Sequence, residues 1–247
     1  TSRKLAFLLS EKKIDLIYDD SFKWTTGFYC KRALEKLGYL IDHFLPDDVD
    51  TIQPAYDLYL NIDESKRYLL PGHLQPSAYW VIDTHMEYDW RLRKARMFNF
   101  VFAGHKSDVG RFKKDGVRNI YWLPMGCDSD IHRDYGVPKE YDVTFVGHYN
   151  HSKDRIKYLN FLKKKLRNYR LFIGQAYGEE MSKIYSKSKI IFNRSIKGYV
   201  NMRIFEAMSC GGFLITDDVS QEGLKDLFGD SPPFLMYRSK KDLIRKI

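Results

Sequence analysis

Short apolar segments alternate with longer amphipathic segments along the first half of the chain. The apolar segments are typical of buried β-strands and cover residues 4–9, 15–19, 40–46, 56–62, 78–83, 100–104 and 119–124. The amphipathic segments place apolar residues at helical spacing, which predicts helices over 29–39, 87–98 and 105–116. Strands that alternate with helices predict a parallel sheet covered by helices.

The alternation is interrupted once, near the middle of the chain. Residues 123–142 are rich in Pro, Gly and Asp, as is typical of a linker. After the linker, further strands are predicted over 142–147, 170–174, 189–195 and 213–217. Further helices are predicted over 154–169, 179–188, 201–209, 221–228 and 239–247. We therefore expect an α/β fold with two domains, residues 1–126 and residues 127–247.

Composition narrows the class of protein. Apolar residues make up 44% of the chain and aromatic residues 15%, which is typical of a folded globular protein. No apolar run approaches the roughly 20 residues that span a bilayer, and the apolar stretch near the start is too short for a signal peptide. The three cysteines are far apart, so a disulfide framework is not expected. Together these features predict a cytoplasmic protein.

The net charge of +9 suits an anionic partner, which leaves a phosphorylated ligand, an acidic membrane face and nucleic acid open. Basic residues gather on one predicted helix, at Lys157, Lys163, Lys164, Lys165 and Arg167. This face has two interpretations, a solvated surface or a peripheral contact with the inner face of a membrane. Nucleic acid is the less favoured partner, because the sequence contains no DNA- or RNA-binding signature.

The most informative stretch is residues 201–218, NMRIFEAMSCGGFLITDD. Asn201 is a candidate N-cap, which places Arg203 and Glu206 on one face of the first two helical turns. A carboxylate there can accept hydrogen bonds from the vicinal hydroxyls of a ribose, and an arginine can hold a diphosphate. The alternative is an intrahelical ion pair between Arg203 and Glu206, followed by a Gly-Gly helix stop.

Three segments in order resemble one enzyme family: NIYWLPMGCDSDIHR (119–133), YDVTFVGHYNHSKDR (141–155) and VNMRIFEAMSCGGFLITDD (200–218). They are similar to nucleotide-sugar glycosyltransferases of the GT-B fold, group-1 family, in particular its spore-maturation-protein-like subgroup. The resemblance implies two Rossmann-like domains that face a cleft, with the donor nucleotide held by the C-terminal domain. It also implies additional C-terminal helices, so that this set is shortened here.

The resemblance assigns donor-binding roles to individual residues. Glu206 matches the second glutamate of the family's E-x7-E motif, which binds the ribose, whereas Gly198 stands at the position of the first glutamate. Because that first glutamate contacts the donor sugar in related enzymes, neither the donor sugar nor the stereochemical outcome is predicted. Arg203 matches the arginine before the FEA of the subgroup, and Gly147 matches the glycine that ends the first strand of the donor domain.

Further residues are candidates to bind the diphosphate or to act on the acceptor side of the site. Lys153 or Arg155, with Arg194, would neutralise the diphosphate. At the end of a predicted strand, Asp83 and His85 are candidates for general base or donor-sugar contact, although a lone histidine is often structural.

Two other features of the sequence, a glycine and a pair of aspartates, are also candidates for parts of a site. Gly27 could contact the acceptor or simply form a turn. The Asp128-x-Asp130 spacing also occurs in metal-dependent transferases, but its position in the linker favours a solvated turn, so no metal site is predicted.

We therefore expect a metal-independent glycosyltransferase with no tightly bound cofactor. Its co-substrate would be a nucleotide-sugar, with UDP or GDP favoured, and its acceptor a glycan, a lipid-linked molecule or a protein. A non-catalytic module that binds a nucleotide-sugar or another polyanion, or a nucleic-acid-binding protein, is the alternative.

Overall fold

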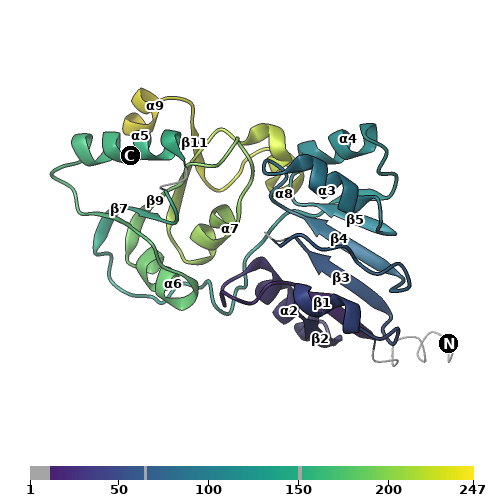
Figure 1. Ribbon diagram of the computed structural model, residues 1–247. Coiled ribbons are helices and arrows are strands. Elements are labelled where there is room, and N and C mark those ends of the chain that lie inside the picture. The colour runs from purple at the N-terminus through teal and green to yellow at the C-terminus, as the bar shows by residue number, and fades with distance from the viewer. Residues whose placement is uncertain (1–11, 64–65, 150–151) are drawn as a thin grey trace, which may run out of the picture. The chain divides into compact units, whose positions relative to one another are not determined.

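The computed structural model describes residues 12–63, 66–149 and 152–247, and the strand predicted over 4–9 lies outside this part (Figure 1). The chain forms two compact units, Thr1–Pro124 and Met125–Ile247. Each unit contains one parallel β-sheet with helices, as the alternating pattern predicted. No helix in the described part of the chain is both long and apolar enough to cross a bilayer.

The first unit contains a six-stranded parallel sheet in the order β2-β1-β3-β4-β5-β6. Its strands are β1 (Lys13–Ile17), β2 (Leu40–Phe44), β3 (Leu58–Ile62), β4 (Ser77–Val81), β5 (Phe100–Ala103) and β6 (Ile120–Trp122). Its helices are α2 (Thr26–Lys36), the 3₁₀-helix η1 (Pro46–Thr51), α3 (Tyr88–Ala95) and α4 (Lys106–Lys114). Every residue of the central strand β4 is buried, as expected for a parallel sheet with helices on its faces.

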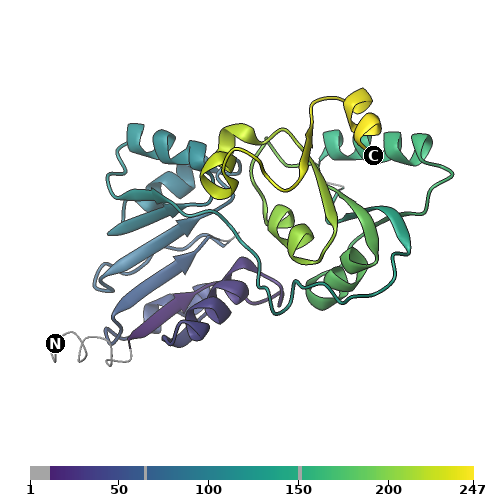
Figure 2. The same cartoon turned by 180° about the vertical axis from the view of Figure 1, so that it is seen from behind.

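The second unit contains a five-stranded parallel sheet in the order β11-β10-β9-β7-β8, shown from both sides in Figures 1 and 2. Its strands are β7 (Tyr141–Val146), β8 (Leu171–Gly174), β9 (Ser188–Phe192), β10 (Phe213–Asp217) and β11 (Leu235–Tyr237). Its helices are α5 (Lys153–Lys165), α6 (Gly178–Ser186), α7 (Met202–Ser209), η2 (Ser220–Glu222), α8 (Leu224–Phe228) and α9 (Lys240–Lys246).

Two apolar clusters fix the helices of the second unit. One cluster contains buried residues of α6, α7 and α8, among them Tyr185 and Ile204. The other contains buried residues of α5 and α9, among them Leu159, Leu162 and Leu243. Burial of large apolar side chains is the main stabilising contribution in such layers.

Two elements of the second unit differ from the sequence-based prediction. Strand β11 was not predicted, because its three residues follow Pro232 and Pro233 and are too short to show a period. The helix predicted over 221–228 is divided at Gly223 into η2 and α8.

The strand order defines a switch point in the second sheet. Counted from β7, the order across the sheet is second, first, third, fourth and fifth, so the chain reverses its direction of winding between β7 and β9. In open parallel sheets, ligands bind outside the carboxyl ends of the strands at this point. Residues 147 and 193, which directly follow β7 and β9, therefore mark the place to search for a site.

Candidate nucleotide-sugar site

Arg203 of α7 lies at the switch point of the second sheet. Its Nη1 donates a hydrogen bond of 2.9 Å to Oδ1 of Asn193, which directly follows β9. A Cβ atom placed on Gly147, which directly follows β7, would lie only 2.0 Å from Arg203 Nη2. The guanidinium also lies over the Phe145 ring, with Cζ 5.0 Å from the ring centroid. The structure thus places Arg203 against Gly147, two residues that the sequence indicated as candidates for donor binding.

The guanidinium of Arg203 is only partly satisfied within the protein. Its Nε is buried and has no hydrogen-bond partner among the described residues. No carboxylate in the described part of the chain forms an ion pair with the Arg203 side chain. The intrahelical ion pair with Glu206 is therefore not observed. A cation held by an amide and an aromatic ring, without a carboxylate partner, has capacity left for an anionic ligand.

Asn201 supports this arrangement without capping the helix. It occupies the N-cap position of α7, but its side chain accepts no hydrogen bond from the helix. Instead, the amides of Asn201 and Asn193 lie 3.4 Å and 3.5 Å apart in two reciprocal contacts. Asn193 is fully buried and also donates to Thr216 Oγ1 at 2.9 Å. Asn193 therefore links α7 to the ends of β9 and β10, and sequence reasoning had not selected it.

Glu206 lies one turn beyond Arg203 and is 9% exposed. Burial raises the pKa of this carboxyl from 4.5 to about 7, and the positive charge of Arg203 partly opposes the shift. Its Oε1 lies 3.8 Å from Nε2 of the fully buried His132. A carboxyl group whose pKa is raised toward neutral pH, one helical turn from Arg203, is a candidate for binding a polar ligand.

The environment of His132 defines which ring nitrogen faces Glu206. The backbone N–H of Asp128 donates to His132 Nδ1 at 3.2 Å, so in the neutral ring the proton resides on Nε2. Burial lowers the pKa of His132, whereas the nearby Asp128 carboxylate raises it. A neutral His132 therefore presents an N–H toward Glu206.

Arg155 is buried and fully engaged with the main chain. Its Nε and Nη2 donate to the carbonyl oxygen of Arg194 at 3.1 Å and 2.8 Å, and its Nη1 donates to the carbonyl oxygen of His148. Burial, with the positive charge of Arg203, lowers the pKa of Arg155 to about 10. Arg155 thus joins the segments that follow β7 and β9.

Arg194 is engaged by carboxylates. Its Nε donates to Asp154 Oδ2 at 2.7 Å, and its Nη1 lies 3.6 Å from Asp217 Oδ2. Lys153 differs, because it is exposed at the first position of α5 and forms no ion pair with the described residues. Among the basic candidates, Arg203 and Lys153 are therefore the two that neither a carboxylate nor a set of main-chain carbonyls occupies in the described part of the chain.

Asp83 and His85 follow β4 in the first unit. The backbone N–H of Asp83 donates to Asp63 Oδ2 at 3.1 Å. The side chain of Asp83 reaches solvent, but surrounding protein atoms and the negative charge of Asp63 raise its pKa, which His85 and Arg91 oppose. The structure thus places Asp83 and His85 close together at the carboxyl edge of the first sheet.

A buried ion pair holds the loop that carries these two residues. Arg91 Nε lies 2.7 Å from Asp63 Oδ2, and both side chains are 4% exposed. Arg91 Nη1 also donates to the Met86 carbonyl oxygen at 2.6 Å. Sequence reasoning missed this pair, although the position of Asp63 directly after the apolar strand β3 was a usable signal.

Gly27 and the Asp128-x-Asp130 segment have local structural explanations. A Cβ atom on Gly27 would lie 2.2 Å from Tyr18 Cγ, so glycine lets α2 pack closely on the residue that follows β1. Asp128 Oδ1 accepts a hydrogen bond of 3.1 Å from the Asp130 backbone, as in an Asx turn. The described residues contain no group of three or more His, Cys, Asp or Glu side chains placed to hold a metal ion.

Sequence similarity bears on the second half of the chain. Residues 138–247 match the model of a family described as "Glycosyl transferase-like". This segment includes Gly147, Arg203 and Glu206. No curated protein sequence is significantly similar to the chain. The spore-maturation-protein-like subgroup remains a prediction.

Several solved structures share the fold. HepE from Anabaena, in complex with UDP and glucose, has a TM-score of 0.61 at 13% identity, over 95% of this chain and 88% of HepE. An alpha-glucosyltransferase in complex with UDP-glucose and DNA containing an abasic site has a TM-score of 0.61 at 9% identity, over 85% and 80%. Sucrose-phosphate synthase from Thermosynechococcus elongatus has a TM-score of 0.59 at 14% identity, over 96% and 89%. At these identities, the similarity shows the α/β fold of the two parallel sheets alone.

Proposed function

We propose that this protein is a glycosyltransferase that moves a sugar from a nucleoside diphosphate to an acceptor hydroxyl, without a tightly bound metal. The observation that carries the proposal is the position of Arg203. This arginine has no carboxylate partner among the described residues and lies between Gly147 and Asn193, where the winding of the sheet reverses. That location is where open parallel sheets bind phosphorylated ligands.

In the proposed donor site, different residues bind the diphosphate and the ribose of the nucleotide. Arg203 and Lys153 would contact the diphosphate, and Glu206 would accept hydrogen bonds from the ribose hydroxyls. Arg155 would act indirectly by holding the main chain at His148 and Arg194 in place. Arg194 would act in the same indirect way through Asp154 and Asp217.

In the reaction, the bond between the anomeric carbon and the diphosphate oxygen breaks, and a new bond forms to the acceptor oxygen. The leaving diphosphate gains negative charge, which Arg203 and Lys153 would stabilise in the transition state. Asp83 and His85 remain our candidates to take the acceptor proton. UDP is the proposed donor nucleotide, because structures of similar fold contain UDP or UDP-glucose.

Donor turnover tests this proposal. The purified chain is incubated with UDP-glucose and other UDP-sugars, and UDP release is measured for the wild type and for Arg203→Ala. We expect slow donor hydrolysis without acceptor, reduced by roughly 100-fold or more in the variant because a charge contact in the transition state is lost. Lys113→Ala, an exposed lysine of α4, is the control.

Gly198 gives the test a second informative outcome. This residue has φ +78°, and a Cβ there would meet nothing within 4 Å, so the position of the family's first glutamate is open. UDP binding with no turnover of any donor would favour the alternative of a non-catalytic nucleotide-sugar-binding module.

A further inference from the structure

The positive charge of the chain is concentrated on two segments of the second unit. Residues 152–170, which include α5, and residues 238–246, which include α9, together contain 13 Lys and Arg but only two Asp. The whole chain contains 41 basic and 32 acidic residues, which leaves 28 basic and 30 acidic residues elsewhere. These two segments therefore supply the whole excess of positive charge in the chain.

Helices α5 and α9 lie beside each other on the same side of the second sheet (Figures 1 and 2). Their inward side chains, among them Leu159, Leu162 and Leu243, form one apolar cluster. Their outward side chains define what we call the basic face, which consists of the exposed residues Lys153, Lys157, Lys163, Lys164, Lys165, Arg167, Arg238, Lys241 and Arg245. The apolar packing beneath holds these charges on one side of the unit.

The charges of α5 are not neutralised by neighbouring acids. In the described part of the chain, Lys157, Arg167 and the three lysines 163–165 form no ion pair. The one acidic residue of this segment, Asp154, is paired with Arg194, and Arg170 is paired with Asp142. Six exposed cations, the five lysines of α5 and Arg167, are thus available to an external anion.

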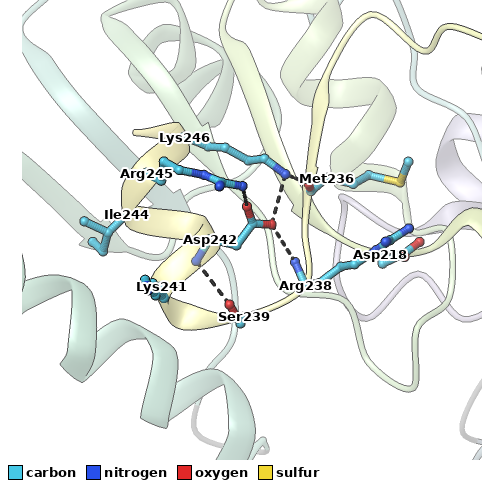
Figure 3. A pocket seen from close by; sticks show the side chains of 9 residues that line it. All are labelled: Asp218, Met236, Arg238, Ser239, Lys241, Asp242, Ile244, Arg245 and Lys246. Carbon is cyan, nitrogen blue, oxygen red and sulfur yellow. Dashed lines mark hydrogen bonds and ion pairs between the residues drawn. The ribbon is translucent and has the colours of Figure 1, made fainter.

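The end of α9 continues the same face. A pocket of about 860 Å³ lies beside α9, and four basic and two acidic residues are among those that line it (Figure 3). Asp242 accepts hydrogen bonds from Arg245 Nη2 at 2.6 Å, from Lys246 Nζ at 3.0 Å and from the Arg238 backbone at 3.1 Å. Lys241, also on the pocket wall, forms no ion pair with the described residues.

We propose that the basic face docks the protein on an anionic lipid bilayer. Five of the six available cations near α5 are lysines, whose compact charges suit a diffuse anionic surface that offers no fixed bidentate partner. Tyr169, in the segment that follows α5, is 55% exposed, and an exposed tyrosine is suited to a membrane interface. The basic face shares Lys153 with the proposed donor site, whereas Lys163, Lys164 and Lys165 have no role in that site.

Vesicle binding tests the inference with the full chain. Cosedimentation is measured with phosphatidylcholine vesicles, with and without phosphatidylglycerol, at low and high salt. We expect binding only to the anionic vesicles, weakened by salt. The triple variant Lys163→Gln/Lys164→Gln/Lys165→Gln should bind at least about tenfold more weakly, because each basic residue near such a surface contributes to the attraction.

The control removes the same charge elsewhere. Lys113→Gln/Lys114→Gln/Arg118→Gln changes exposed residues at and after the end of α4 and should bind like the wild type. The proposal is overturned if the wild type ignores anionic vesicles at low salt, or if both triple variants lose binding equally. Tighter binding of duplex DNA than of vesicles, with loss in the 163–165 variant, would assign the face to nucleic acid instead.

Discussion

His132 Nε2 lies 3.8 Å from Glu206 Oε1, and the backbone of Asp128 holds the other nitrogen of the same ring. The linker segment thus places a histidine beside a carboxyl group of α7 that is far from it in sequence. Burial lowers the pKa of His132, so the neutral ring directs its Nε2–H toward the carboxyl group, at a distance longer than a hydrogen bond. The oxygens of Glu206 can then still accept hydrogen bonds from a ligand.

Glu206→Gln should weaken UDP binding while preserving the packing of α7. The amide has nearly the same shape but accepts at one oxygen only, so ribose hydroxyls would lose partners at a cost of about 1–3 kcal/mol. Isothermal titration with UDP measures the change. Glu179→Gln, an exposed change at the start of α6, is the control, and equal affinity of both variants would remove Glu206 from the site.

UDP affinity should rise between pH 6 and pH 8 as Glu206 loses its proton near pH 7. Hydroxyl donors favour the charged carboxylate, so binding strengthens with deprotonation. The terminal phosphate of UDP also titrates, near pH 6. Its contribution persists in Glu206→Gln, so the difference between the two pH profiles isolates Glu206, and superimposable profiles would contradict the assignment.

Asp15→Asn should stabilise the first unit at pH 8. Asp15 is fully buried, neither oxygen accepts a hydrogen bond from the described residues, and burial with the nearby Asp42 raises its pKa from 3.8 to about 7. The folded state therefore binds the proton more tightly, and stability is lost as pH rises from about 4 to 7.

Urea unfolding of Asp15→Asn and the wild type at pH 5 and pH 8 measures this effect. The variant's free energy of unfolding should exceed that of the wild type by an amount that grows with pH, to about 2–4 kcal/mol at pH 8. Asp57→Asn, an exposed position before β3, is the comparison. A pH-independent difference would mean that Asp15 is not protonated in the folded protein.

Gly147→Ala should destabilise the second unit by about 1–3 kcal/mol and lower UDP affinity. The backbone has φ +140°, and the new Cβ would meet Arg203 Nη2 at 2.0 Å, so both the turn and the guanidinium must shift. Gly110→Ala, within α4 and open on all sides, should be neutral or stabilising. Urea unfolding and UDP titration of both variants check the contrast.

Arg155→Gln should reduce stability more than Arg203→Ala does. Its loss leaves the partly buried carbonyl groups of Arg194 and His148 without this donor, at about 1–3 kcal/mol. Arg167→Gln, exposed just beyond α5, should change stability little. If Arg155→Gln unfolds like the wild type but loses UDP binding, Arg155 contacts the ligand directly.

The sequence predicted most of the fold because the helices show a helical period and the buried strands are continuous apolar runs between turn residues. The runs that became β4 and β7 and the helix around Arg203 are examples. The site residues were predicted mainly from the short motif at residues 201–218. A motif of this kind indicates which residue types are present but not which groups they contact. Nothing in the spacing showed that Arg155 and Arg194 are occupied by main-chain carbonyls and carboxylates, because those contacts join segments far apart in sequence. Asn193 and His132 were missed for the same reason.

Titration of the purified chain with UDP, in parallel with GDP, ADP, CMP and dTDP, tests the central claim most directly. The account predicts saturable one-site binding of UDP that falls at least about tenfold in Arg203→Ala and in Glu206→Gln, while Lys113→Ala binds like the wild type. Binding of no nucleotide by the folded wild type, or UDP binding unchanged in both site variants, would contradict it.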